Sequence, residues 1–178
     1  MYDNNDIDPI IDGQIWLGNL RSAQNIQALQ DRGIIKVLTV MNGTNLKYDI
    51  EDGFIHKKVE VVDLGDQNII QYFGECLNFI EGEERVLVHC SAGASRSATI
   101  VIAYLMWAKR MAYENASEFV RNKRYVVCPN FGFREQLKMF ERLLKANNYD
   151  INRINFKAIK WNNSLCTSYF RELIIYIF

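Results

Sequence analysis

The sequence lacks the features of a membrane-spanning, secreted or disordered protein. Its longest stretch without a charged residue, from Ser97 to Ala108, is too short for a membrane-spanning helix, which needs about 20 apolar residues. Residues 1–12 contain no basic start followed by an apolar run, so we expect no secretory signal. With only 2 prolines and 10 glycines, the chain has little room for flexible linkers. We therefore expect a cytoplasmic protein, with access to the nucleus, that does not insert into a membrane.

The composition is that of one folded domain. The chain has 178 residues, of which 49% are hydrophobic and 24% are charged, and both values are ordinary for a globular domain. Basic and acidic residues number 21 each, so the formal net charge is zero.

The four cysteines follow neither a disulfide pattern nor a zinc pattern. Cys76, Cys90, Cys128 and Cys166 are widely spaced, with no CxxC pair and no Cys/His cluster of the zinc type. We expect no bound metal, and we expect reduced thiols because the cytosol keeps thiols reduced. Cys76, Cys128 and Cys166 are predicted to be small buried residues, whereas the neighbours of Cys90 indicate a different role.

Short β-type apolar runs alternate along the chain with longer helical ones. We predict strands at 15–18, 34–41, 54–62 and 86–88. We predict helices at 22–30, 68–81, 97–110, 112–124 and 133–146, the first of them capped by Ser22 and closed by Gly33. Strands that alternate with helices predict an α/β fold, here a single domain with a central, mostly parallel sheet flanked by helices.

One segment combines the features of an anion-binding loop with a nucleophile. Residues 88–97 read Val-His-Cys-Ser-Ala-Gly-Ala-Ser-Arg-Ser and join a predicted buried strand to a predicted buried helix. Such a junction points successive backbone N–H groups into one concavity, at the positive end of the helix dipole. Gly93 permits a backbone conformation that other residues resist. Small side chains also allow an oxyanion to approach the backbone closely, at Ser91, Ala92, Ala94 and Ser95.

Four side chains of this segment suit phosphoryl chemistry. The field that binds an anion also favours a thiolate over a thiol, so Cys90 is predicted to be a nucleophile. The guanidinium fork of Arg96 matches two oxygens of a phosphoryl group, and Ser97 can donate a hydrogen bond to the sulfur. We interpret His89 as a hydrogen-bonding residue that orients the loop rather than as a base.

The oxygen that leaves a phosphate ester needs a proton donor. The segment Val62-Asp63-Leu64-Gly65-Asp66-Gln67 follows the strand predicted at 54–62 and offers two carboxylic acids, Asp63 and Asp66. Its position is suitable, because ligand sites of α/β sheets form at the carboxyl ends of strands. The residues alone do not choose between the two, although Asp66 also suits a helix cap or a first-turn charge of the next helix.

The segment His89–Ser97 resembles the signature of the dual-specificity protein phosphatases, of the small atypical type, within the cysteine-based protein tyrosine phosphatase superfamily. The resemblance extends to residues 15–18 and 33–38, to Asp63 with the following Tyr72-Phe73, and to Arg124 with residues 129–133. It covers about residues 10–146 and implies a protein tyrosine phosphatase-like fold.

The resemblance also implies hydrolysis of phosphate monoesters on proteins, at phosphotyrosine and at phosphoserine or phosphothreonine, through a cysteinyl-phosphate intermediate. Cys90 would attack phosphorus, Asp63 would act first as acid and then as base, and Ser97 would assist the departure of sulfur. Phosphate would be bound by Ser91, Ala92, Gly93, Ala94, Ser95 and Arg96, with His89 and Asn130 in supporting positions. The reaction would need no cofactor and no metal.

For the whole chain, we expect a catalytic domain at residues 1–148 and a C-terminal extension at 149–178 that packs on the domain or on a partner. The loop interior, residues 91–95, is uncharged, which favours phosphoprotein substrates over phosphoinositides. We expect no nucleic acid among the partners, and either a monomer or a homodimer formed through the C-terminal segment.

Two other functions remain open at this point. One is a phosphopeptide-binding module of the same fold without catalysis, although Cys90 and Arg96 are both present. The other is a sulfur-transfer or arsenate-reducing enzyme, in which Cys76 or Cys128 would form a disulfide with Cys90.

Overall fold

Five strands form one sheet at the centre of the computed structural model, which describes residues 6–161. In chain order they are β1 (Ile7–Ile11), β2 (Ile15–Gly18), β3 (Ile34–Val40), β4 (Ile55–Val59) and β5 (Arg85–His89). Their order in the sheet is β1-β2-β5-β3-β4. β1 runs antiparallel to β2, and the other neighbouring pairs are parallel. The prediction of a mostly parallel sheet flanked by helices is confirmed.

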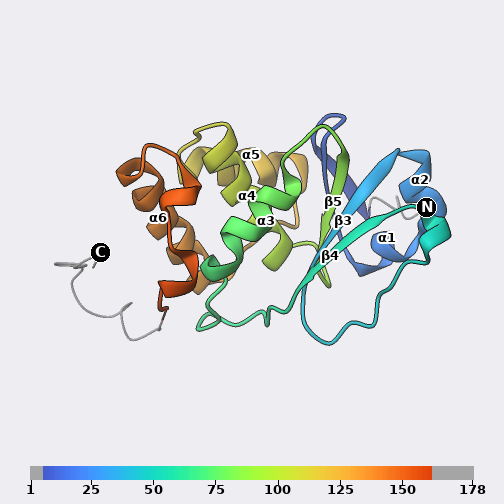
Figure 1. Ribbon diagram of the computed structural model, residues 1–178, viewed down its shortest axis with the longest axis horizontal. Helices are drawn as coiled ribbons and strands as arrows, with labels where there is room; N and C mark the ends of the chain where they lie inside the picture. Colours follow the sequence, from blue (N-terminus) through green and yellow to red (C-terminus); the bar gives the residue numbers. More distant parts are fainter. Residues whose placement is uncertain (1–5, 162–178) are drawn as a thin grey trace.

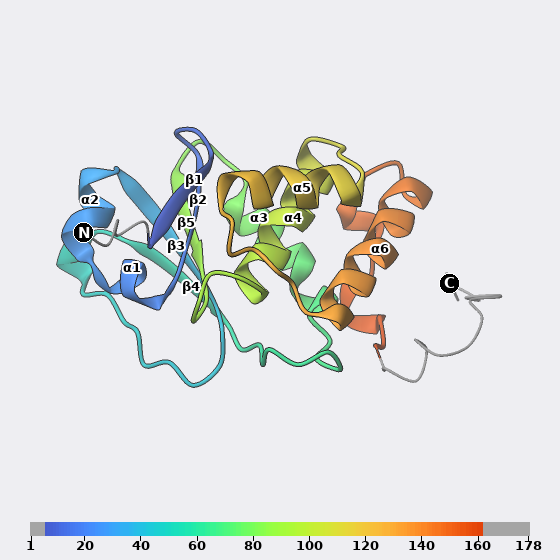
Figure 2. The ribbon, with the colours of Figure 1, turned by 180° about the vertical axis from the view of Figure 1, so that it is seen from behind.

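Helices cover both faces of this sheet, with α3, α4, α5 and α6 on one side and α1 and α2 on the other (Figures 1 and 2). Their bounds are α1 (Leu20–Gln24), α2 (Ile26–Asp31), α3 (Phe73–Ile80), α4 (Arg96–Ala108), α5 (Tyr113–Lys123) and α6 (Phe131–Ala146). Short 3-10 turns add η1 (Ile50–Asp52), η2 (Ile70–Tyr72), η3 (Ile151–Arg153) and η4 (Phe156–Ala158).

Alternate residues of the strands build two hydrophobic cores. Leu38 of β3 and Val88 of β5 belong to the larger core under the four helices. Their neighbours Val37 and Leu87 belong to the smaller core under α1 and α2. α4 lies centrally on the larger core and is buried from residue 96 to 106, so the loop that precedes it leads from the middle of the sheet directly into the middle of the helical layer.

Two predictions about the N-terminal part were wrong. β1 was not predicted; it contains Pro9, and proline is tolerated here because β1 is an edge strand. The helix predicted at 22–30 is two short helices, capped by Asn19 and Asn25 rather than by Ser22. Each asparagine side chain accepts a backbone N–H three residues on, which makes asparagine a strong helix start. The hydroxyl of Ser22 instead donates to the carbonyl of Asn19.

The helix predicted at 68–81 begins as the 3-10 turn η2. The side-chain oxygen of Gln136, a buried residue of α6, accepts the backbone N–H groups of Ile69 and Ile70 at 2.9 and 3.0 Å. The N–H of Ile69 also donates to the carbonyl of Gln67 at 3.0 Å. Gln136 thus binds the start of η2 to α6, and α3 follows from Phe73.

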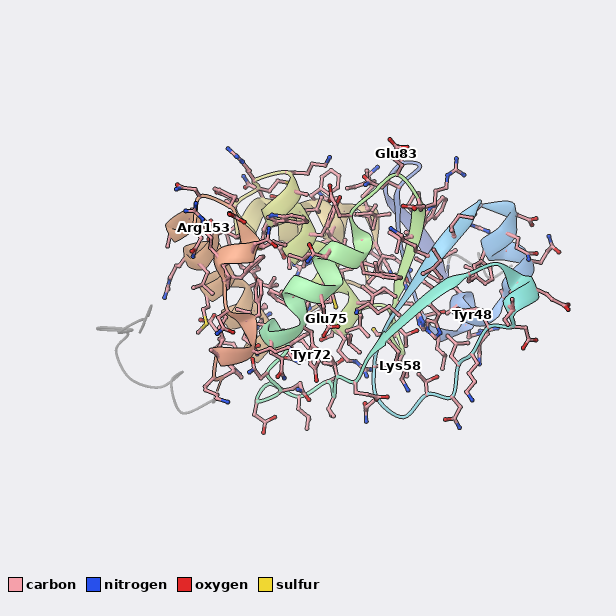
Figure 3. All side chains as sticks on the ribbon, viewed as in Figure 1. Tyr48, Lys58, Tyr72, Glu75, Glu83 and Arg153 are labelled. Atoms are coloured by element: carbon pink, nitrogen blue, oxygen red, sulfur yellow. The ribbon has the colours of Figure 1, made fainter. Side chains whose placement is uncertain are left out.

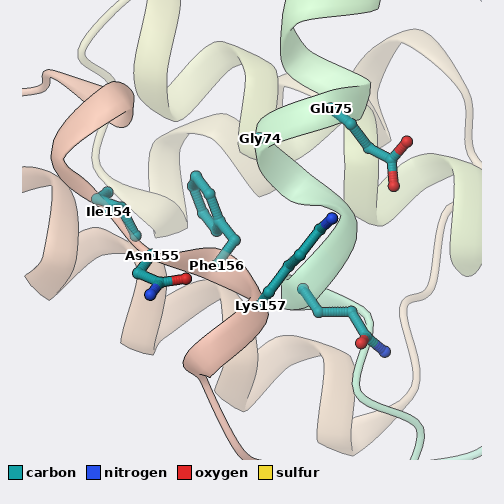
Figure 4. Close-up of a pocket in the computed structure, with 7 residues that line it drawn as sticks. Gly74, Glu75, Ile154, Asn155, Phe156 and Lys157 are labelled. Atoms are coloured by element: carbon teal, nitrogen blue, oxygen red, sulfur yellow. The ribbon is translucent and has the colours of Figure 1, made fainter.

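The described part of the predicted C-terminal extension, residues 149–161, packs on the larger core through Ile151, Ile154, Phe156 and Trp161. η4 lies against α3, where Gly74 leaves room for the ring of Phe156. A cavity of about 320 Å³ opens between these two elements (Figure 4), lined by Gln71, Gly74, Glu75, Ile154, Asn155, Phe156 and Lys157. Residues 162–178, with Cys166, lie outside the described residues, and the boundary at 148/149 stays a prediction.

Candidate active site

The loop between β5 and α4 is held from outside by its carbonyl groups. Each carbonyl from Ser91 to Ala94 accepts a hydrogen bond of 2.8–3.2 Å. The donors, in order, are Leu20 N, Arg124 Nη2, Arg124 Nε and Cys128 N. Because the C=O and N–H of one peptide unit point in opposite directions, the next N–H groups turn toward the loop interior. The loop is thus a concave row of N–H donors, a geometry suited to binding an anion.

Gly93 sits where this loop meets β2. Its φ of 68° lies in the left-handed region that favours glycine. A Cβ at this position would lie 2.5 Å from the carbonyl oxygen of Gly18 and 2.9 Å from Nη2 of Arg124. The close approach of β2, the loop and Arg124 therefore requires a residue without a side chain.

The sulfur of Cys90 lies buried at the floor of this loop. It accepts hydrogen bonds from the backbone N–H of Gly93 at 3.3 Å and from the hydroxyl of Ser97 at 3.1 Å. Two donors aimed at one sulfur, at the start of α4, favour a sulfur that carries negative charge. The structure brings Cys90, Gly93 and Ser97 together as the sequence suggested.

Asp63 reaches this loop from the segment after β4. Its Oδ1 accepts the hydroxyl of Ser95 at 2.7 Å and Nδ2 of Asn130 at 2.9 Å. The backbone N–H of Asn130 also donates to the Ser95 hydroxyl at 3.2 Å, and its Oδ1 caps α6 by accepting the N–H of Phe133. Asn130 therefore fixes the start of α6 and Asp63 at the same time.

Asp66 does not reach the loop. It is exposed, and among residues 6–161 it makes no hydrogen bond or ion pair. It also caps no helix, because η2 begins at Ile70 without a side-chain cap. The interpretation of Asp66 as a cap was wrong, and the geometry favours Asp63 as the carboxyl group of the site.

Arg96, the first residue of α4, is buried beside Asp63. Its Nη1 donates to the carbonyl of Val61 at 3.3 Å, and its Nε lies 3.5 Å from Oδ2 of Asp63. That Nε atom is buried and makes no hydrogen bond within the described structure. Its one charged contact there is the ion pair with Asp63. A buried guanidinium N–H is normally hydrogen-bonded, so Nε retains the capacity to donate to an anion at the loop.

The imidazole of His89 is part of a chain that links both histidines of the protein. The hydroxyl oxygen of Thr39 lies 2.7 Å from Nε2 of His89 and 2.8 Å from Nε2 of His56. Nδ1 of His89 faces the carbonyl oxygen of Cys90 at 3.4 Å. A carbonyl only accepts, so Nδ1 carries the proton of neutral His89 and Nε2 accepts from Thr39. Thr39 can then accept from Nε2–H of His56.

The charge state of His89 fits an orienting role. Burial lowers the pKa of His89 to about 4; the carbonyl of Cys90 acts in the opposite direction and His56 lowers the pKa slightly. Burial, followed by the charge of Lys58, also lowers the pKa of His56. The rings of Tyr48 and His56 form a T-shaped pair with their centroids 5.0 Å apart; Tyr48 is labelled in Figure 3. Sequence reasoning missed Thr39 and His56; the one available signal was a hydroxyl within the apolar run 37–41.

Arg124 also has a position that the sequence did not reveal. Besides the two loop carbonyls, it pairs through Nη1 with Oδ2 of Asp8 on β1 at 2.6 Å, and both side chains are largely buried. It thereby ties the end of α5 to the loop and to the sheet edge. The partners are 116 residues apart, and no local pattern connects them.

Of the other two described cysteines, both predicted to be buried, one is buried and one is exposed. Cys76 is buried as predicted, and burial raises the pKa of its thiol. Cys128 was predicted to be buried, but it is exposed: it lies in the loop between α5 and α6, and its backbone N–H donates to the carbonyl of Ala94. Within residues 6–161, no cluster of three His, Cys, Asp or Glu side chains is arranged to hold a metal ion. No described helix is long and apolar enough to cross a membrane.

Known proteins share this arrangement of chain and site. Residues 15–143 match the family model of the dual specificity phosphatase catalytic domain. Dual specificity protein phosphatase 1 of Arabidopsis thaliana is 37% identical over 150 residues, covering 82% of this chain and 75% of that protein. Human dual specificity protein phosphatase 2 is 40% identical over 131 residues, 71% of this chain and 41% of the relative.

Solved structures show the same fold. Human tyrosine phosphatase-like serine/threonine/tyrosine-interacting protein is 32% identical with a TM-score of 0.73, over 78% of this chain and 97% of that chain. A mouse protein described as a dual specificity phosphatase, complexed with zinc tungstate, is 25% identical with a TM-score of 0.76, over 84% and 94% of the two chains. With the family match over most of its length, this chain belongs to the dual-specificity phosphatases of the cysteine-based protein tyrosine phosphatase superfamily, enzymes that hydrolyse phosphate esters on tyrosine, serine and threonine of proteins.

Proposed function

We propose that this chain dephosphorylates proteins with Cys90 as nucleophile, Asp63 as general acid and base, and Arg96 with the loop N–H groups as the phosphate-binding elements. The observation that carries the proposal is the convergence of Gly93 N–H and the Ser97 hydroxyl on the Cys90 sulfur, with the buried Arg96 guanidinium and Asp63 beside the same loop. Such a site holds donors for a dianion and a nucleophile for its phosphorus.

In the first step, a lone pair of the Cys90 sulfur forms a bond to phosphorus on the side opposite the ester oxygen. The bond from phosphorus to that oxygen breaks, and the oxygen takes a proton from Asp63. The carboxylate left behind keeps its two hydrogen bonds from Ser95 and Asn130, which stabilise the negative charge. Arg96 and the N–H groups bind the three non-bridging oxygens throughout.

In the second step, water gives a proton to the Asp63 carboxylate as its oxygen bonds to phosphorus. The sulfur–phosphorus bond breaks, and its electrons return to Cys90 as a thiolate. The hydroxyl of Ser97 and the N–H of Gly93 donate to that sulfur and stabilise it as a leaving group. His89 orients the loop through the carbonyl of Cys90 and transfers no proton.

A relative supports the nature of the ligand. The mouse protein is described as complexed with zinc tungstate, and tungstate is an oxyanion that resembles phosphate. We infer that the loop of this chain binds tungstate as a phosphate mimic through its backbone N–H groups. No step of the proposed reaction runs through a metal ion or a cofactor.

A phosphopeptide-binding module is the second candidate, because a solved relative bears the name of a phosphatase-like interacting protein. The presence of Cys90, Ser97, Arg96 and Asp63 in one hydrogen-bonded site favours catalysis here. The two functions separate in one experiment, hydrolysis of an aryl phosphate by the wild-type chain and by Cys90→Ser. Turnover that Cys90→Ser abolishes supports the enzyme, whereas phosphopeptide binding without turnover by the wild type supports the module.

The proposal extends to the setting of the reaction. A thiolate nucleophile must stay reduced, which suits the cytoplasm, with access to the nucleus. The substrates are phosphoproteins, and we propose a catalytic domain at 1–148 with 149–178 packed on it or, in a homodimer, on a second copy. One contact supports packing on the same chain: Nε1 of Trp161 donates to the carbonyl of Gly65 at 2.8 Å, next to the segment that carries Asp63.

A further inference from the structure

An uncharged apolar rim borders the candidate active site. Seven large apolar side chains are exposed among the described residues, and four of these directly neighbour site residues in the chain. Val62 and Leu64, which are 38% and 57% exposed, flank Asp63. Tyr125, 90% exposed, follows Arg124, and Phe131, 54% exposed, follows Asn130. We refer to these four residues as the rim.

Contacts to the catalytic loop fix the positions of the three rim segments. Asp63 and Asn130 are joined through the Ser95 hydroxyl, and Arg124 binds the carbonyls of Ala92 and Gly93. Each rim residue is therefore the chain neighbour of a residue that contacts the loop.

Two of the rim segments also touch each other. The start of α6 packs directly on the segment after Asp63, because a Cβ at Gly132 would collide with the carbonyl of Gly65. Leu64 and Phe131 are the neighbours of these two glycines, so they stand on adjoining segments on one side of the loop. Tyr125 stands on the segment that binds the loop carbonyls.

Charges of both signs lie near the rim. Asp66 is exposed two residues after Leu64, and Lys123 is exposed two residues before Tyr125. The guanidinium of Arg134 lies 5.9 Å from the centre of the Phe131 ring. Selectivity at this surface therefore rests on apolar contact, and aromatic side chains are the residues that contribute most to such contacts.

We propose that the rim selects phosphoproteins in which apolar residues flank the phosphorylated side chain. This inference rests on the proposed function, because a phosphoryl group seated on Cys90 places the residues before and after it against the rim. A peptide is the favoured occupant over a phosphoinositide membrane, because the loop interior from Ser91 to Ser95 carries no cation for an inositol phosphate.

The test compares three phosphotyrosine peptides of equal length, with leucine, serine or glutamate on both sides of the phosphotyrosine. We expect the leucine peptide to have a kcat/KM at least about tenfold above the other two, mostly through KM, because burial of apolar rim side chains stabilises the bound peptide. The glutamate peptide should be no better than the serine peptide.

Variants connect this preference to the rim. Tyr125→Ser and Phe131→Ser should each lower kcat/KM for the leucine peptide by about five- to tenfold, the usual effect of truncating an aromatic contact. The matched control is Ile50→Ser. Ile50 is 98% exposed but lies on η1, which precedes β4, and thus at the amino-terminal ends of the parallel strands, whereas the loop follows the carboxyl end of β5. It should lower no rate.

The outcomes separate this inference from the proposed function. A small aryl phosphate is too short to reach the rim, and Ile50→Ser and the wild type should hydrolyse it at the same rate. Hydrolysis of the aryl phosphate with equal use of the three peptides would overturn the rim inference alone. Faster hydrolysis of a phosphoinositide in phosphatidylcholine vesicles than of the leucine peptide would also overturn it. No hydrolysis of any of these substrates would overturn the proposed function, and the rim inference with it.

Discussion

Replacing Gly93 by alanine tests whether the loop between β5 and α4 depends on the close approach of β2, the loop and the Arg124 side chain. The new Cβ would lie 2.5 Å from the carbonyl oxygen of Gly18 and 2.9 Å from Nη2 of Arg124. Neither neighbour can easily retreat, because Gly18 belongs to β2 within the sheet and Arg124 is ion-paired with Asp8 at 2.6 Å. The loop itself must therefore move.

The energetic effect has two parts, and the chain offers a control for one of them. Alanine in the left-handed region costs about 1–2 kcal/mol, and overpacking costs about 1–3 kcal/mol more. Gly43 has the same φ of 68°, but a Cβ there would meet nothing within 4 Å. Gly43→Ala should therefore lower the free energy of unfolding by about 1–2 kcal/mol and Gly93→Ala by about 2–5 kcal/mol.

Urea unfolding and aryl-phosphate kinetics on both variants measure the two effects. Gly43→Ala should keep the wild-type kcat/KM, because the new Cβ would meet nothing within 4 Å and no neighbour has to move. Gly93→Ala should lower kcat/KM at least about 100-fold, since a displacement of about 1 Å at a reacting group has that effect. If the two variants matched in both stability and rate, the reasoning about the crowded loop would be refuted.

Three further predictions concern the acid, the histidine and the anion. Asp63→Asn should slow hydrolysis of alkyl phosphates by about 10²–10⁴-fold and hydrolysis of activated aryl phosphates far less. Asp66→Asn should change neither rate. If Asp66→Asn, and not Asp63→Asn, slowed alkyl phosphates more than aryl phosphates, the acid would be misassigned. The pKa of His89 is lowered from 6.5 to about 4, mainly by burial, so between these pH values the unfolded chain binds a proton that the folded chain does not. Urea titrations should therefore show the free energy of unfolding falling by up to about 3 kcal/mol as the pH drops from 6.5 to 4. His89→Gln should reduce that slope, and an unchanged slope would argue against the buried neutral imidazole. Tungstate at 100 times its Kd should stabilise the wild type by about 2.7 kcal/mol, measured as a rise in Tm, and an equal rise in Arg96→Ala would place the oxyanion elsewhere.

The sequence was most informative where the structure depends on neighbouring residues. The strand, loop and buried helix around Cys90 are contiguous, so their apolar pattern and the small residues at 91–95 predicted the anion-binding loop. Helix ends were harder to predict, because Asn19 and Ser22 are both good caps. The structure uses Asn19, which lies in the turn after β2.

Contacts between distant segments could not be predicted from the pattern. Asp63 and Asp66 were equally suitable by residue type, and hydrogen bonds from Ser95 and Asn130, 32 and 67 residues away from Asp63, distinguish them. The pairing of Arg124 with Asp8 likewise depends on the packing of the whole sheet.

Direct detection of the phosphoenzyme is the measurement that tests the central claim. An aryl phosphate with a radiolabelled phosphoryl group would be mixed with the protein, the reaction stopped in acid during turnover, and the labelled peptide identified. We predict that the label is on Cys90 and that Cys90→Ser neither takes up label nor releases phosphate, because a serine hydroxyl stays protonated where a thiolate forms. Release of phosphate at the wild-type rate by Cys90→Ser, or label on a different residue of the wild type, would contradict the account.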